Sequence, residues 1–90
     1  MIHILFFGQL ADMATNELGK SEFDFTLPVQ PPSNITLNEL RRIISKDSTL
    51  LADELKKSSN LCAVNQRICH TDTLLNDGDE VAFMSPLSGG

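Results

Sequence analysis

Basic residues are scarce in this sequence. Seven Lys and Arg stand against twelve Asp and Glu, so the formal net charge is −5 and the isoelectric point is near 4.7. Nucleic-acid binding draws its affinity from clustered Lys and Arg, so we expect no nucleic-acid partner. The densest basic cluster is the pair Arg41 and Arg42, which we interpret as part of a solvated helix face. An acidic surface instead suits a protein partner with a basic docking face.

Cysteine and long apolar segments are also scarce. Cys62 and Cys69 are the two cysteines, which is too few for the four-ligand set of a structural zinc site, so we expect no bound metal and no permanent cofactor. No segment approaches the ~20 apolar residues of a membrane span, and residues 1–7 lack the basic leader of a signal peptide. These absences predict a cytoplasmic protein with no membrane partner.

The length and the hydrophobic pattern predict one small domain. Ninety residues suit a single core, and 41% of them are hydrophobic. The pattern predicts strands at 2–7, 22–27, 61–64, 67–69 and 80–84, and helical segments at 10–18, from 37 onward and at 48–57. One main helix against a mixed sheet is an α+β roll. We place this domain at residues 1–84 and a flexible tail, held by nothing, at residues 85–90.

The main helix has a recognisable start. Thr36 and Glu39 have the spacing of a capping box, in which each side chain accepts a hydrogen bond from the other residue's backbone. The residues expected to face the core then follow at helical spacing: Leu37, Leu40, Ile43 and Ile44. In the second helical segment the residues expected to face inward are Leu50, Leu51 and Leu55.

A hairpin is predicted around Asn65 and Gln66, because Asn tolerates the left-handed backbone of a two-residue turn. In that register Cys62 faces Cys69, at a Cα separation of about 4.5–5.5 Å that a disulfide could bridge. A reducing cytosol favours free thiols, so we predict that both are free and dispensable for function.

A second turn is predicted at residues 76–79. The turn contains Asp77 and Asp79, and Glu80 follows it. These three carboxylates could form a metal or acid–base cluster, but we interpret them as solvated turn carboxylates.

The sequence ends in Gly89-Gly90, directly after a predicted strand. With Gly at about 7% of residues, such an end arises by chance in roughly 0.5% of chains. Five residues from Pro86 span at most ~18 Å, so the carboxylate could reach deep into a partner. Glycine has no Cβ, so a narrow channel could close around it. A frayed end is the alternative, but the pattern favours a functional carboxyl group on Gly90.

Three blocks, at residues 5–10, 63–66 and 77–90, carry a resemblance to a known family. They read LFFGQL, AVNQ and DGDEVAFMSPLSGG. Together and in this order they resemble the small subunits of molybdopterin synthase, which are ubiquitin-like β-grasp proteins. The resemblance covers the whole chain and implies a β-grasp roll with a Gly-Gly tail.

The resemblance implies that the Gly90 carboxylate, next to Gly89, carries the chemistry. An adenylyltransferase of the ubiquitin-activating type would adenylate it with ATP, which serves as a transient co-substrate. A sulfur donor protein would then convert it to a thiocarboxylate. The large synthase subunit, in a heterotetramer of two small and two large subunits, would use this sulfur on cyclic pyranopterin monophosphate. The chain would be no enzyme by itself.

The resemblance also implies a partner-binding surface. Phe7, Ile68 and Met84 match an exposed apolar contact surface of the family, although an ordinary core position is the alternative for each. The expected contacts within the tail are Pro86, Leu87 and Ser88. The family usually has an aromatic residue and two prolines before the tail, where this sequence has Met84-Ser85-Pro86.

Other functions fit a Gly-Gly end. The chain could carry sulfur for thiamine or for tRNA thiolation, or it could be a ubiquitin-like modifier joined to lysine through an isopeptide bond. A plain binding module is a third alternative. The Phe-Phe-Gly-Gln start and the second helical segment favour the molybdopterin subunit.

Overall fold

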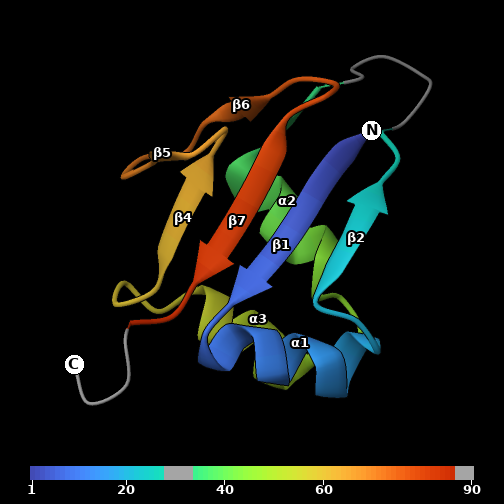
Figure 1. Cartoon of the computed structure of the whole chain (residues 1–90), viewed down its shortest axis with the longest axis vertical. Coiled ribbons are helices and arrows are strands. Elements are labelled where there is room, and N and C mark those ends of the chain that lie inside the picture. The colour runs from blue at the N-terminus through green and yellow to red at the C-terminus, as the bar shows by residue number, and fades with distance from the viewer. Residues whose placement is uncertain (28–33, 87–90) are drawn as a thin grey trace.

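The computed structural model describes residues 1–27 and 34–86 (Figure 1). Its strands are β1 (Ile2–Phe7), β2 (Glu22–Phe25), β3 (Ile35–Thr36), β4 (Leu61–Val64), β5 (Arg67–Ile68), β6 (Leu74–Leu75) and β7 (Glu80–Met84). Its helices are α1 (Gln9–Leu18), α2 (Leu37–Ile44) and α3 (Thr49–Leu55). Within these described residues, no helix has the length and apolar character to cross a membrane.

The main sheet is mixed and has the strand order β2-β1-β7-β4-β5. Its central pair, β1 and β7, is parallel, and the other pairs are antiparallel. The first and last strands of the chain therefore lie side by side. Figure 1 shows α2 behind this sheet, while α1 and α3 lie across its lower end. The expected α+β roll, with a mixed sheet on one main helix, is confirmed.

The start of α2 is the capping box that the sequence predicts. The Thr36 hydroxyl accepts a hydrogen bond from the Glu39 amide at 3.2 Å, and the Glu39 carboxylate accepts one from the Thr36 amide at 3.1 Å. One face of α2 then packs into the core through residues that are at most 9% exposed: Leu37, Leu40 and Ile44. The capped end fixes which face of the helix meets the sheet.

Two residues expected in the core lie outside it. Ile43 is 38% exposed and Leu50 is 66% exposed. Each successive residue turns a helix by 100°, so Ile43 lies at the edge of the buried stripe of α2. Leu51 and Leu55, four residues apart, already fill the narrow contact that the short α3 makes with the core. Leu50 therefore points to solvent.

The strand boundaries differ slightly from those predicted. β2 ends at Phe25 rather than residue 27, and β5 ends at Ile68 rather than residue 69. The two-residue strands β3 and β6 were not predicted, because their pairing of Ile35 with Leu75 joins segments far apart in the sequence. Pro28 and the predicted stiff loop that follows it lie outside the described residues.

Both predicted turns are confirmed. Asn65 and Gln66 have φ values of 52° and 69°, the left-handed pair that a two-residue hairpin of this hand requires. At the second turn Gly78 has a φ of 90°, and the Asp79 amide donates to the Asn76 carbonyl at 3.1 Å. Gly19, with a φ of 81°, ends α1 as its left-handed cap.

Candidate functional site

The face of the sheet that α2 leaves uncovered carries the predicted apolar surface. Alternate residues of β1 point to opposite faces, so Ile4 and Phe6 are buried while Phe7 is 49% exposed. The parallel register places Phe7 beside Met84, which is half-buried. Met84 in turn lies opposite Leu61 in β4. Strand pairing thus joins apolar side chains from three strands.

Ile68 belongs to the same face. It pairs with Ala63, which pairs with Ala82 of β7 on its other side. Ile68 is 46% exposed and Leu61 is 44% exposed. The four large side chains define what we call the outer apolar face: Phe7, Leu61, Ile68 and Met84. Leu61 was missed by sequence reasoning, although its alternation with buried Cys62 was a usable signal.

The start of the predicted tail is tied to the body of the protein. The Ser85 hydroxyl accepts hydrogen bonds from the amides of Gln9 at 2.7 Å and Leu10 at 3.4 Å, the first residues of α1. It also donates to the Phe7 carbonyl at 3.4 Å. An α-helix leaves its first amides without internal partners, and Ser85 satisfies two of them from the other end of the chain.

Gly8 makes this contact possible. It has a φ of 68°, a left-handed conformation that favours glycine, and a Cβ at this position would lie 2.4 Å from the Ser85 hydroxyl oxygen. The expectation that nothing holds the chain from residue 85 is therefore not met at Ser85 itself. Pro86 follows and is exposed. The predicted site residues Leu87, Ser88, Gly89 and Gly90 lie outside the described residues.

The acidic turn before β7 has a structural role, because Asp79 accepts hydrogen bonds from two other residues. The Asp79 carboxylate accepts hydrogen bonds from the side-chain amide of Asn65 at 3.0 Å and from the backbone amide of Asn76 at 2.7 Å. The Asn65 side chain also accepts from the Glu80 amide at 3.0 Å. Asp79 thus links the two turns. Within residues 1–27 and 34–86, no group of three or more His, Cys, Asp or Glu is placed to hold a metal ion.

Cys62 and Cys69 face each other as the hairpin register requires. The Cys69 amide donates to the Cys62 carbonyl at 2.8 Å, which continues the β4–β5 ladder by one pair. Both thiols are free, as predicted, with Cys62 buried and Cys69 half-buried. Burial raises the pKa of the Cys62 thiol to about 12, so this thiol is protonated and weakly nucleophilic at neutral pH.

A mixed sheet wrapped on one main helix, with parallel first and last strands and an exposed apolar face beside the last strand, defines a ubiquitin-like protein of the β-grasp class. Residues 4–90 match the model of the ThiS family, and the chain belongs to that family.

Two curated relatives match from end to end. The chain is 34% identical over 90 residues to the molybdopterin synthase sulfur carrier subunit of Escherichia coli, with 100% of each chain covered. It is 28% identical over 90 residues to the protein of the same name from Haemophilus influenzae, again with 100% of each chain covered.

Proposed function

We propose that this protein is the sulfur carrier subunit of a molybdopterin synthase. The observation that carries the proposal is the end-to-end match to two proteins of that name, at 34% and 28% identity. The fold supports it, because the last strand of the sheet, β7, ends at Met84, six positions before Gly90 in the sequence. The outer apolar face offers the synthase large subunit a docking surface beside that strand.

In the proposed cycle the Gly90 carboxylate is activated first. Its oxygen attacks the α-phosphorus of ATP on an adenylyltransferase of the ubiquitin-activating type, and pyrophosphate leaves. The resulting acyl adenylate is an anhydride with a good leaving group. Sulfide-level sulfur released by a sulfur donor protein then attacks the acyl carbon, AMP leaves, and Gly90 ends in a thiocarboxylate.

The thiocarboxylate then serves as the sulfur source for the dithiolene of molybdopterin. On the large subunit its sulfur attacks cyclic pyranopterin monophosphate, and hydrolysis returns Gly90 to a carboxylate. The heterotetramer would contain two small and two large subunits. The described part of this chain supplies a rigid body and a docking face, and the chemistry takes place on the partners.

The hydrogen bonds of Ser85 give the segment that ends at Gly90 a fixed starting point on the body of the protein. Gly90 lies five residues beyond Ser85, so its reach into a partner is measured from that anchor. In a site where a nucleophile and an acyl carbon must meet, a displacement of ~1 Å can cost ~100-fold in rate. The hydrogen bonds that the Ser85 hydroxyl accepts from the first amides of α1 fix where the reach begins.

The test is sulfur transfer in a reconstituted assay with the large subunit and the precursor. We expect protein isolated from its own cell to show the mass gain of sulfur replacing one oxygen. Deleting Gly90, or adding one residue after it, should reduce molybdopterin formation by ~100-fold or more. The thermal unfolding midpoint should not change. Normal molybdopterin formation by the extended chain would overturn the role of Gly90.

The mass measurement also separates the rival functions. Attachment of the chain to lysines of larger proteins would identify a protein modifier instead. A thiocarboxylate that is active with a thiamine or tRNA thiolation system, and inactive with the molybdopterin precursor, would identify a carrier for another pathway.

A further inference from the structure

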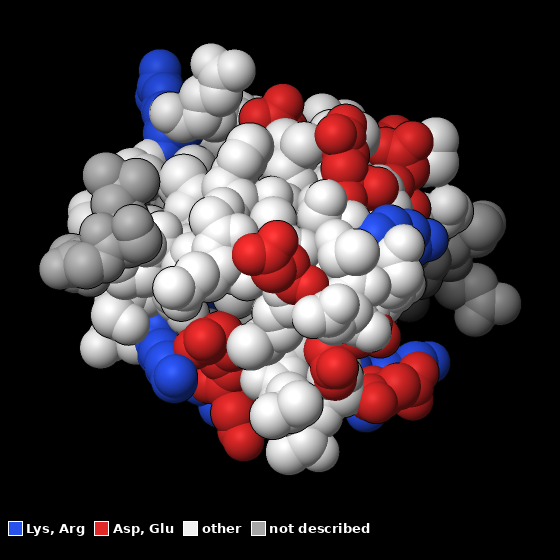
Figure 2. Space-filling model, turned by 60° about the horizontal axis from the view of Figure 1, so that its bottom comes forward, with Lys and Arg blue, Asp and Glu red and all other residues white. Residues whose placement is uncertain are grey.

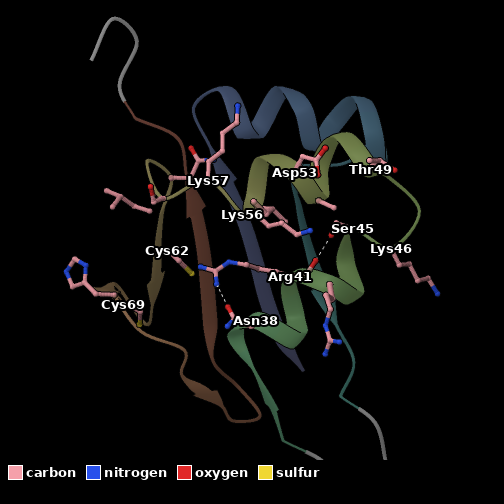
Figure 3. Close-up of a pocket in the computed structure, with 17 residues that line it drawn as sticks. Asn38, Arg41, Ser45, Lys46, Thr49, Asp53, Lys56, Lys57, Cys62 and Cys69 are labelled. Atoms are coloured by element: carbon pink, nitrogen blue, oxygen red, sulfur yellow. Dashed lines mark hydrogen bonds between the residues drawn. The ribbon is translucent and has the colours of Figure 1, made fainter.

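A second surface lies on the helix side of the sheet. A groove of about 770 Å³ opens between α2, α3 and the β4–β5 hairpin. Its walls carry five cationic side chains, namely Arg41, Arg42, Lys46, Lys56 and Lys57. Polar groups suited to hydrogen bonding also line the groove, among them Asn60 and the two that Figure 3 labels, Asn38 and Thr49. Ligand pockets typically enclose about 300–1,000 Å³, so this groove could hold a sizeable ligand.

The groove has a charge opposite to that of the rest of the protein. It contains five of the seven Lys and Arg of the chain and one of its twelve acidic residues, Asp53. The rest of the chain therefore holds two basic and eleven acidic residues. Figure 2, seen from the end at which α1 lies, shows acidic side chains spread over the face and basic ones toward its margins. The cations gathered in this hollow give it a positive field within an otherwise acidic protein.

The cations of the groove are mostly without anionic partners. Among the described residues one ion pair involves them, between Lys57 and Glu54 at 2.9 Å. Arg41 donates to the neutral Asn38 side chain at 2.6 Å and lies over the Phe83 ring at 5.9 Å. Its Nε is buried and has no hydrogen-bond partner in the described structure. A buried guanidinium nitrogen without an acceptor is costly, so Arg41 keeps unused hydrogen-bonding capacity at the wall of the groove.

We propose that this groove binds an acidic peptide segment of a partner protein. In Figure 3 Arg41 points toward Cys62, whereas Lys46 and Lys57 point away from each other. Two of the cations lie in α2, and the other three lie in the segments that follow α2 and α3. Cations spread in this way match carboxylates spaced along an extended chain better than a single phosphate, which needs converging donors. The eleven acidic residues elsewhere repel the long phosphate backbone of a nucleic acid. This inference does not depend on the sulfur chemistry.

The groove and the outer apolar face are separate surfaces. Phe7, Ile68 and Met84 do not line the groove, and Cys62 faces it from the helix side of β4. Leu61 lies at the boundary and contributes to both. An acidic segment can therefore bind while a partner covers the outer apolar face, and the groove would add affinity or selectivity to that docking.

The probe for this proposal is a ten-residue peptide of alternating Glu and Gly with a fluorescent label. Its binding to the full chain is measured by anisotropy and by amide chemical shifts, beside a matched Gln–Gly peptide and inorganic phosphate. We expect the Glu peptide to bind, with shifts confined to α2, α3 and the β4–β5 hairpin. The Gln peptide should bind at least roughly tenfold more weakly, because the attraction is between charges.

The decisive variant removes three exposed groove cations, Arg42→Gln, Lys46→Gln and Lys56→Gln, and should weaken Glu-peptide binding roughly tenfold or more. Its matched control changes the two basic residues outside the groove, Lys20→Gln and Arg67→Gln, and should change binding by less than about twofold. Equal weakening by both variants, or equal binding of the Glu and Gln peptides, would overturn the proposal. If phosphate binds as tightly as the peptide and causes the same chemical shifts, the ligand of the groove is a small anion and the peptide proposal is wrong.

Discussion

The two sides of the main sheet differ in what they offer a partner. The outer apolar face has large hydrophobic side chains, and no helix within residues 1–27 and 34–86 covers it. It includes Met84, the last residue of β7. The helix side has a filled core and, at its margin, a groove that holds five of the seven cations. One face suits burial against another protein, and the other suits charge recognition. Alternation along a strand places two such surfaces a few ångströms apart on the same backbone.

The outer face is itself divided along its length. At the Phe7 end it is apolar, whereas at the other end the His3 ring contacts Asp24 at 2.6 Å and Glu22 at 2.8 Å. Desolvating an ionic cluster is costly, so the apolar end is the better candidate for a protein contact. Four predictions test four regions in order of expected effect: the apolar end of the outer face, the Gly8–Ser85 contact beside it, the thiols on the helix side and the ionic end.

The largest effect is expected at Met84. Met84→Asp places a charge in the middle of the outer apolar face, so binding to the synthase large subunit should weaken by at least ~1–2 kcal/mol. Titration calorimetry measures this change. The control is Leu50→Asp. It introduces the same charge at a position in α3 that is more exposed than Met84 and lies away from the outer apolar face. Normal binding by Met84→Asp would show that the partner docks elsewhere.

The next effect concerns the anchor between Gly8 and Ser85. Ser85→Ala removes the cap of α1 and should lower the free energy of unfolding by ~1 kcal/mol. Ser85→Thr keeps the hydroxyl and should recover most of that loss. Gly8→Ala should cost more, about 1–3 kcal/mol, because it adds a clash with Ser85 to an unfavourable φ.

Urea denaturation measures these changes, and Gly19→Ala is the matched control for Gly8→Ala. Gly19 also has a positive φ, of 81°, but a Cβ there meets nothing within 4 Å. The difference between the two glycine variants therefore reports the Ser85 contact. If both cost the same, Ser85 does not constrain this turn.

A smaller effect is expected for the thiols on the helix side. Replacing Cys62 and Cys69 by Ala should leave sulfur transfer within a few-fold of wild type and lower stability by ~1 kcal/mol. The reason is that Cys62 packs as a small hydrophobe whose raised pKa keeps it protonated. A double variant that folds and docks normally yet fails to deliver sulfur would place the thiols on the transfer route.

The smallest effect is the pH dependence at the ionic end. Hydrogen bonds to Asp24 and Glu22 raise the pKa of His3 above its ordinary value of 6.5. The stabilisation from its charged form is therefore complete below pH 6.5 and is lost as the pH rises through the raised pKa. NMR titration of the His3 ring measures the pKa, and His3→Gln should flatten the stability profile above pH 6.5. A His3 pKa at or below 6.5 would contradict the prediction.

Local patterns in the sequence were sufficient for most elements of this fold. The capping box at Thr36 and Glu39 placed the start of α2. The turn pair Asn65-Gln66, in which Asn tolerates a left-handed backbone, placed the hairpin and the facing cysteines. These features depend on residues at most a few positions apart, or on a register that one short turn sets. The Gly-Gly end of the sequence stays a prediction, because residues 87–90 lie outside the described part of the structure.

The tertiary structure decided what depends on distant segments. The β3–β6 pair, the neighbours of Phe7 on the outer face and the Ser85 cap on α1 each join residues more than 35 positions apart. No local rule indicates that Ser85 would find two unpaired amides at the start of the first helix. The sequence indicated a solvated helix face for Arg41 and Arg42 for the same reason. Only the packing of α2 against α3 and the hairpin gathers three further cations around this pair: Lys46, Lys56 and Lys57. Local sequence determined most helices, strands and turns and the capping box of α2, and chain folding decided the cap of α1 and the surfaces that the elements share.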